Sequence, residues 1–256
     1  MIYYFSGTGN TRHVAQALAQ RLEDKTIPVN WETAPSLSHD ERDTLGIVLP
    51  VYAWGPPLVI EHFLQEMPWL IMGKQPYIYV VLTCGDDVGL TDRVVKRALK
   101  KKGLKVSAVF SVQMRNTYVC LPGFDIDKPE TERQKMERAD RRIEQIAAYI
   151  EKRVSPHPPL LTPGNMPWLK TYILRPLFNR WLISDSHFHI DAEKCIRCGQ
   201  CVRTCPLDNM RMPAAPEVPQ WTGRCTHCLA CYHVCPQHAI EYGFFTRGKG
   251  QVKING

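Results

Sequence analysis

Two cysteine runs of identical spacing constrain this chain more than any other feature of its sequence. The first extends from Cys195 to Cys205 and the second from Cys225 to Cys235, and each has the spacing C-x2-C-x2-C-x3-C-P. Four thiolates at this bacterial spacing are typical of a [4Fe–4S] cube. Zinc also binds thiolates in C-x2-C pairs, but a zinc site needs neither a third cysteine at the same short step nor a Cys-Pro closing each run. The two runs therefore predict two [4Fe–4S] clusters.

The runs resemble those of bacterial 2[4Fe–4S] ferredoxins over about residues 186–246. In such ferredoxins the fourth cysteine of each run ligates the other cluster. The resemblance therefore implies two ligand sets, Cys195, Cys198, Cys201 and Cys235 in one, and Cys225, Cys228, Cys231 and Cys205 in the other. It also implies a small α+β module for one-electron transfer. Because four cysteines complete each cube, we expect His227, His233 and His238 to lie at the surface or to tune the clusters by hydrogen bonding.

A phosphate-binding motif lies near the beginning of the chain. A short apolar strand, expected at residues 2–5, leads into Ser6-Gly7-Thr8-Gly9-Asn10-Thr11, and a helix is expected from His13 to about Leu22. Backbone N–H groups at the start of a helix bind phosphate, and the helix dipole favours its negative charge. The motif is not a Walker A loop, because it lacks Gly-Lys-Ser/Thr, and it is not a dinucleotide loop, because Arg12 occupies the position of the third glycine. Its three hydroxyls suit one terminal phosphate, and the run resembles the FMN phosphate loop of flavodoxins.

Alternating apolar and helical segments predict the fold of this half. After the first strand, strand-like segments are expected at about 26–31, 45–50, 77–82 and 106–112, and helical ones at about 57–66, 90–102 and 129–152. Continuous apolar runs are typical of strands covered by helices on both faces. The pattern predicts an α/β fold, a flavodoxin-like doubly wound parallel five-stranded sheet, in which FMN binds at the carboxyl ends of the strands near the switch point.

The loops at those carboxyl ends are the candidates for binding the flavin ring. Tyr52 or Trp54 can stack on the ring, while the backbone of 53–55 and 83–86 can bond its polar edge. Residues 113–118 either close the site from the side or form a surface excursion. The full candidate set for the flavin is Ser6, Gly7, Thr8, Gly9, Asn10, Thr11, Tyr52, Ala53, Trp54, Gly55, Thr83, Cys84, Gly85, Asp86, Asn116 and Tyr118.

Cysteine usage and charge bear on the setting of the protein. Only Cys84 and Cys120 lie outside the runs, too few for a disulfide framework, and no signal peptide is evident, so we expect a reduced, cytoplasmic protein. Cys84 is expected to be a small buried residue rather than a reactive one. The formal net charge is +7. Since each cube with its thiolates carries about −2 and a flavin phosphate about −2 more, the charge balances anionic cofactors and does not predict nucleic-acid binding.

A proline-rich stretch at 156–164 marks a domain boundary. After it, residues 166–183 form an aromatic amphipathic segment, which Lys170, Arg175 and Arg180 prevent from being a membrane span. We expect it to pack the two modules together, and contact with a membrane surface is the alternative. The predicted domains are a flavodoxin-like domain at 1–153, a linker and docking helix at 154–184 and a 2[4Fe–4S] ferredoxin domain at 185–256.

Together the two halves resemble a family of flavodoxin–ferredoxin fusion proteins found in anaerobes. The resemblance implies FMN, two [4Fe–4S] clusters and transfer of electrons between them and on to redox partner proteins, such as ferredoxin or oxidoreductases. A reductase that takes electrons from ferredoxin and reduces a small organic acceptor at the flavin is an alternative, and a redox sensor is another. Cys84, Asp86 and Tyr118 are the only candidate proton donors beside the flavin loops, and no paired carboxylates or His–Cys arrangement marks one of them as the donor. No catalytic residue is therefore assigned.

Overall fold

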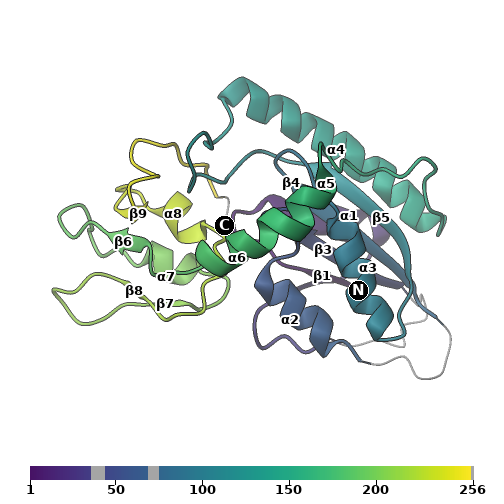
Figure 1. Ribbon diagram of the computed structural model, residues 1–256, viewed down its shortest axis with the longest axis horizontal. Coiled ribbons are helices and arrows are strands. Elements are labelled where there is room, and N and C mark those ends of the chain that lie inside the picture. The colour runs from purple at the N-terminus through teal and green to yellow at the C-terminus, as the bar shows by residue number, and fades with distance from the viewer. Residues whose placement is uncertain (36–43, 69–74, 255–256) are drawn as a thin grey trace.

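The first half of the chain forms one parallel sheet between two pairs of helices (Figure 1), in a computed structural model that describes residues 1–35, 44–68 and 75–254. Its elements are β1 (Ile2–Tyr4), α1 (Asn10–Leu22), β2 (Thr26–Pro28), β3 (Thr44–Pro50), α2 (Leu58–Glu66), β4 (Tyr77–Cys84), α3 (Thr91–Lys101), β5 (Val106–Gln113) and α4 (Pro129–Glu151). The strand order is β2-β1-β3-β4-β5, and all neighbouring strands are parallel. The flavodoxin-like prediction is therefore confirmed.

The apolar strands are continuous because both faces of the sheet are covered. Alternate residues of β3 point to opposite faces, and both Ile47 and Val48 are fully buried. On one face Ile47 packs with apolar side chains of α2 and α3, and on the other Val48 packs with those of α1 and α4. These two cores fix the sheet, so the loops at its carboxyl edge are held on a rigid support.

The second half forms a small module around the two cysteine runs. Its elements are β6 (Phe188–Ile190), α7 (Gln200–Thr204), β7 (Met210–Arg211), β8 (Gln220–Trp221), α8 (Ala230–Val234) and β9 (Ile240–Tyr242). The two runs share one backbone path: Arg197 and His227 have φ of 54° and 62°, and Gly199 and Leu229 have φ of 71° and 63°. These left-handed residues curl the chain so that successive cysteines face inward before each short helix begins.

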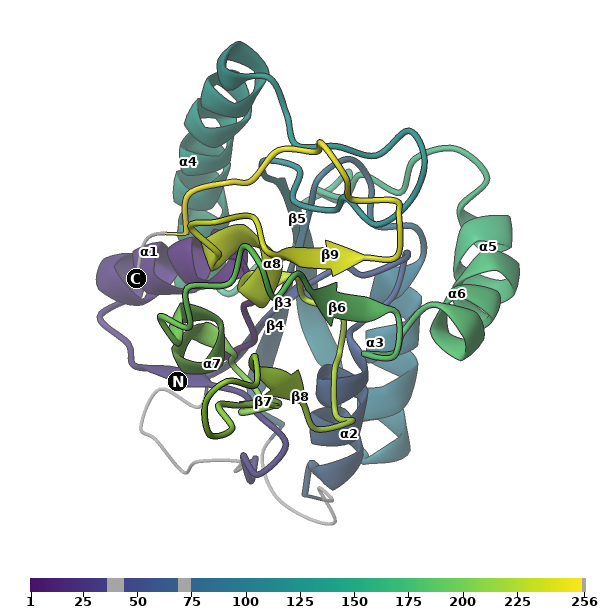
Figure 2. The ribbon, with the colours of Figure 1, turned by 90° about the vertical axis from the view of Figure 1, so that its left-hand side faces the viewer.

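The module is joined to the sheet domain by a shared core and by the end of the chain. Val119 and Cys120, which follow β5, are fully buried against Tyr232 and Tyr242 of the module. The basic tail, residues 247–254, crosses this junction, and the sequence predicts no function for it. Lys249 Nζ donates to the carbonyl oxygens of Val119 and Leu121, both at 2.6 Å. Figure 2 shows the module in front of the sheet, with the tail passing over it.

The segment between the halves is one helix in three pieces, α5 (Pro167–Leu169), the π-helical η1 (Lys170–Leu174) and α6 (Arg175–Trp181). Its orientation differs from our expectation. The apolar stripe expected to pack the modules together faces outward, with Trp168 and Trp181 about 60% exposed. Thr171 and Arg175 face inward instead, because the surface beneath them offers backbone carbonyls and a carboxylate. In the described part of the chain no helix is long and apolar enough to cross a membrane.

Candidate functional site

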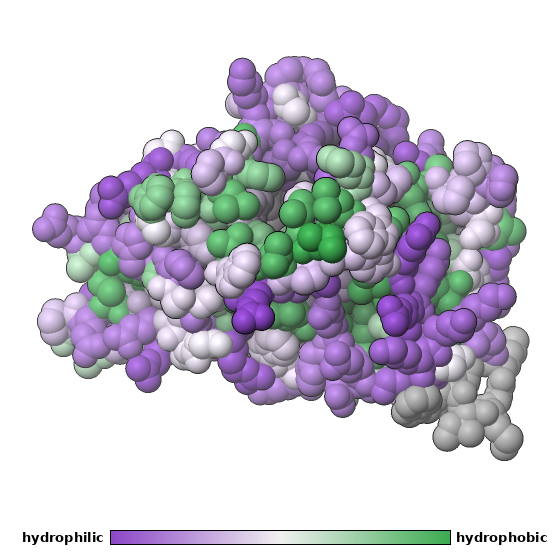
Figure 3. Space-filling view, viewed as in Figure 1, coloured by the Kyte–Doolittle hydropathy of each residue, from purple (hydrophilic) through white to green (hydrophobic). Residues whose placement is uncertain are grey.

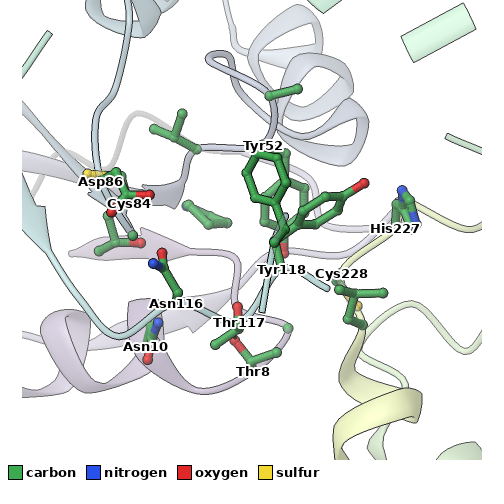
Figure 4. Close-up of a pocket in the computed structure, with 18 of the residues that line it drawn as sticks. Thr8, Asn10, Tyr52, Cys84, Asp86, Asn116, Thr117, Tyr118, His227 and Cys228 are labelled. Atoms are coloured by element: carbon green, nitrogen blue, oxygen red, sulfur yellow. The ribbon is translucent and has the colours of Figure 1, made fainter. Parts of the chain in front are cut away.

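A cavity of about 400 Å³ lies where the carboxyl edge of the sheet meets the small module. Of the residues expected to bind flavin, all except Gly9 and Gly55 line it. Figure 4 shows Cys84 and Asn116 toward one side of the cavity and His227 and Cys228 toward the other. The loops after β1, β3, β4 and β5 meet here because the carboxyl ends of parallel strands share one edge.

One end of the cavity has the properties of a phosphate site. The Ser6 hydroxyl is buried and has no hydrogen-bond partner among the described residues. Helix α1 begins at this point with no side-chain cap, so its first N–H groups are available to an anion. The other two hydroxyls are already engaged, since the Thr11 and Thr83 hydroxyl oxygens are 2.8 Å apart and Thr8 Oγ1 lies 3.4 Å from Thr117 Oγ1. These features fit a bound phosphate, with Ser6 as the free hydroxyl.

The turn at residues 52–55 forms the wall on the side expected to hold the flavin ring. Tyr52 and Gly55 exchange two backbone hydrogen bonds, of 2.9 and 3.2 Å. Between them Ala53 and Trp54 have φ of 45° and 61°, a left-handed conformation that is costly for residues with a side chain. The turn is held from outside by Thr171, whose Oγ1 donates to the Trp54 carbonyl oxygen at 3.0 Å. The linker helix thus fixes a wall of the cavity.

The loop at 113–118 closes the cavity from the side and is not a surface excursion. Both Asn116 and Tyr118 line the cavity. The backbone N–H of Asn116 donates to Asp127 Oδ2 at 2.7 Å, which fixes its position opposite Gly85. Arg115 and Thr117 of the same loop also line the cavity, although the sequence pattern did not predict them. Arg115 forms an ion pair of 2.7 Å with Glu132, so its charge is largely balanced.

The two cysteines outside the runs are buried. Cys84 is 7% exposed and Cys120 is fully buried, and burial raises the pKa of each thiol to about 12. Since the thiolate is the reactive form, we expect both to remain unmodified by iodoacetamide at neutral pH in the folded protein. Peptide mass spectrometry checks this, with the denatured protein as the control for full labelling. Rapid native labelling of Cys84 would show that its loop opens to solvent.

The small module supplies the remaining wall of the cavity, which the sequence did not predict. His227, Cys228 and Leu229, all within the second cysteine run, line it together with Phe178 of α6. Both ring nitrogens of His227 and the Tyr118 hydroxyl are buried and have no hydrogen-bond partner in the described ranges. Burial lowers the pKa of His227 to about 3 and raises that of Tyr118, so both groups are uncharged at neutral pH.

Of the two alternatives expected for these histidines, a surface position is wrong for His227 and His233. His227 is 4% exposed and stacks on Phe178 with ring centroids 6.0 Å apart. His233 is also buried, and its Nε2 donates to the Thr117 carbonyl oxygen at 2.7 Å while its Nδ1 accepts from Val252 N–H at 3.2 Å. Of the three histidines in or beside the second run, only His238 is exposed. The two buried rings therefore belong to the junction between the modules.

The phosphate loop and the second cysteine run are in direct contact. A side chain at Gly7 would place its Cβ 2.5 Å from the Cβ and 2.8 Å from the carbonyl oxygen of Cys228. Real Cβ atoms do not approach so closely, so only glycine allows the loop to lie against the run at this point. The predicted phosphate site and a predicted cluster ligand thus share one wall.

The eight cysteines of the runs form two groups in space. Cys195, Cys198, Cys201 and Cys235 together line a second, smaller cavity. Burial is the largest cause that raises the pKa of Cys231, and the nearby thiols of Cys228, Cys225 and Cys205 raise it further, followed by Cys201 of the first group. Among the described residues no group of three or more His, Cys, Asp or Glu side chains lies close enough together to hold a single metal ion.

Comparison with known proteins identifies both halves. Residues 1–116 match the family model of a flavodoxin domain, and residues 188–242 match that of a 4Fe-4S dicluster domain. The putative electron transport protein YccM of Escherichia coli (strain K12) is 36% identical over 55 residues, which are 22% of this chain and only 15% of that protein. The chain therefore joins an N-terminal flavodoxin domain to a C-terminal 4Fe-4S dicluster domain. These two matches agree with the flavodoxin–ferredoxin arrangement expected from the sequence.

Two solved structures match part of the chain. The flavodoxin of Streptococcus pneumonia TIGR4 is 18% identical, and the match covers 57% of this chain and 96% of that one with a TM-score of 0.38. A putative flavoprotein from Bacteroides uniformis is 17% identical, with 54% and 96% covered and a TM-score of 0.35.

Proposed function

We propose that this protein relays electrons between FMN and two [4Fe–4S] clusters and passes them to redox partner proteins. The observation that carries the proposal is the contact of Cys228, a predicted cluster ligand, with Gly7 of the phosphate loop. When bound, FMN supplies exchange of one or two electrons, and each cluster supplies exchange of one. The Ser6 hydroxyl and the start of α1 would hold the phosphate. The turn at 52–55 and the loops at 83–86 and 116–118 would hold the ring.

The arrangement of the cysteines supports an order for the two clusters. The set with Cys228 adjoins the flavin cavity, whereas the set with Cys198 is farther along the module and Cys198 itself is exposed. Beside it Ile196 is 61% exposed, Arg203 is an exposed cation, and Lys194 pairs with Asp191 at 3.2 Å. An exposed apolar side chain beside the outer cluster suits contact with a partner protein. The outer cluster is therefore the proposed point of exchange with partner proteins.

One observation favours a second function, the reduction of a small organic acceptor. The Tyr118 hydroxyl and the His227 ring face the flavin cavity without partners in the described part of the chain. Burying such groups unpaired costs about 1–3 kcal/mol each, so a ligand that bonds to them would bind favourably. FMN itself is one such ligand. A small uncharged carbonyl or nitro compound that binds next to FMN is a second.

The test is to purify the protein without oxygen and to measure bound FMN, iron and sulfide. We expect one FMN and about eight iron and eight sulfide per chain, as two cubes require. Turnover is then assayed with reduced ferredoxin as donor and a panel of small carbonyl and nitro compounds. A relay shows no turnover with any of them. Absence of flavin would overturn the proposed relay, and turnover with one compound would establish the reductase.

Replacing Ser6 by alanine should weaken FMN binding without weakening the fold. Loss of a hydrogen bond to a charged phosphate costs about 1.5–3 kcal/mol, which is roughly a 10- to 100-fold loss of affinity. The FMN-free protein should become up to about 1–3 kcal/mol more stable, because a buried unpaired hydroxyl is removed. Thr11→Val is the matched control: its hydroxyl is bonded to Thr83, so it should lower the stability of the FMN-free protein. FMN titration measures the affinity, and urea unfolding measures the stability of the FMN-free protein. Equal changes in stability for the two variants would contradict the assignment of Ser6 as the free hydroxyl of the phosphate site.

A further inference from the structure

The helix at residues 167–181 presents its polar face to the protein and its apolar face to solvent. Lys170 Nζ lies 2.6 Å from Asp87 Oδ2, and Thr171 Oγ1 both donates to the Trp54 carbonyl oxygen and accepts from Leu90 N–H at 2.9 Å. Arg175 donates to the Pro56 carbonyl oxygen at 2.9 Å and pairs with Glu61. These bonds fix the rotation of the helix, so its outward face is a defined feature of the fold.

The outward face holds most of the exposed large apolar side chains among the described residues. Of the thirteen large hydrophobic residues exposed in the described chain, eight lie on it: Met166, Trp168, Leu169, Tyr172, Ile173, Leu174, Leu177 and Trp181. Figure 3 shows hydrophobic residues gathered along the helix on the side of the molecule seen in Figure 1. Contiguous apolar surface of this kind marks a site of interaction, since each Å² left in water costs about 25 cal/mol.

The charges and aromatic residues of this face favour a lipid surface as its partner. Between Met166 and Ile183 the chain has no aspartate or glutamate, and Arg180 is its exposed cation. Trp168 and Trp181 lie near its two ends, roughly 20 Å apart for thirteen residues of helix. Tryptophan and tyrosine concentrate at the boundary between lipid headgroups and acyl chains, where a ring meets both apolar and wet surroundings.

We propose that the outward face of residues 166–181 docks this protein on the surface of an anionic bilayer. The helix is too short and too tightly bonded inward to cross the membrane, so its axis lies in the plane of the headgroups. Because Lys170 and Thr171 contact Trp54, docking places the flavin cavity beside the bilayer. This inference does not depend on the proposed relay, since it rests on the helix alone.

Sedimentation with vesicles tests the proposal with the intact holoprotein. Vesicles of about three parts phosphatidylcholine to one part phosphatidylglycerol should bind it, and binding should weaken for phosphatidylcholine alone. Trp168→Glu should lower the binding constant at least about tenfold, since it removes an aromatic contact and adds a repelled charge. Phe244→Glu is the matched control, because Phe244 is an exposed aromatic residue, 69% accessible, outside this helix. It should bind as the original protein does.

Folding and the nature of the partner are checked in the same samples. Both variants should keep the FMN content and circular dichroism of the original protein, because both side chains are exposed. The proposal would be overturned if the protein bound neither kind of vesicle. It would also be overturned if Trp168→Glu and Phe244→Glu lowered the binding constant equally. A dimer in vesicle-free solution that Trp168→Glu dissociates would assign the face to a second copy of the chain, and would also overturn it.

Discussion

Removal of iron and sulfide should unfold residues 188–242 while the parallel sheet remains folded. The helices of this module have only five residues each, and its strands have two or three. Elements so short cannot bury enough surface to be stable alone, and structural metal sites in small domains contribute about 10–16 kcal/mol at neutral pH. The flavodoxin domain, in contrast, has a core on each face of its sheet.

Hydrogen exchange measured by mass spectrometry distinguishes the two halves. After chelation, amides of β6 and β9 should lose their protection, and those of β3 and β4 should keep it. Residues 119–120 should also exchange faster, because they pack against Tyr232 and Tyr242 of the module. Persistent protection of β9 in iron-free protein would show that the module folds without clusters.

The second large effect is expected from Cys228→Ser, compared with Cys198→Ser. Cys228 lies against the phosphate loop, so its loss should disrupt the inner cluster and remove the route within one chain from clusters to flavin. A route within one chain corresponds to millimolar effective concentration. At micromolar protein, reduction of the flavin through the clusters should therefore slow by about 10²–10³-fold.

The matched variant, Cys198→Ser, should behave differently. Cys198 is exposed and belongs to the outer group, so its loss should slow reduction by an external donor and leave transfer between the inner cluster and flavin unchanged. Rapid mixing with a one-electron donor, followed by flavin absorbance, separates the two steps. Identical kinetics of the two variants would contradict the order of clusters.

Much of the fold follows from local sequence, because local patterns fix local structure. The continuous apolar run at β4 predicts a strand buried on both faces, and both strand and burial are found. Ser6–Gly7–Thr8 and the turn around Trp54 were predicted to share a site, since parallel strands end at one edge, and the structure places both at the cavity.

The rest depends on contacts that no local pattern encodes. Gly7 touches Cys228 from the far end of the chain, so the sequence around His227 indicates a cluster run and nothing about a flavin cavity. The helix at 167–181 shows the second limit. Its apolar periodicity predicts a buried face, but Thr171 and Arg175 form the inward hydrogen bonds that decide its rotation. Periodicity identifies the faces of a helix and does not specify which of them is buried.

The most direct test of the relay is the dependence of flavin reduction on protein concentration. The holoprotein is mixed rapidly, without oxygen, with a one-electron donor that reduces the clusters first, and flavin absorbance is followed. If the clusters and flavin of one chain exchange electrons across the wall formed by Gly7 and Cys228, the rate of flavin reduction after the clusters are reduced is the same at every protein concentration. A rate that rises in proportion to protein concentration would show that electrons pass between molecules, and would contradict the relay.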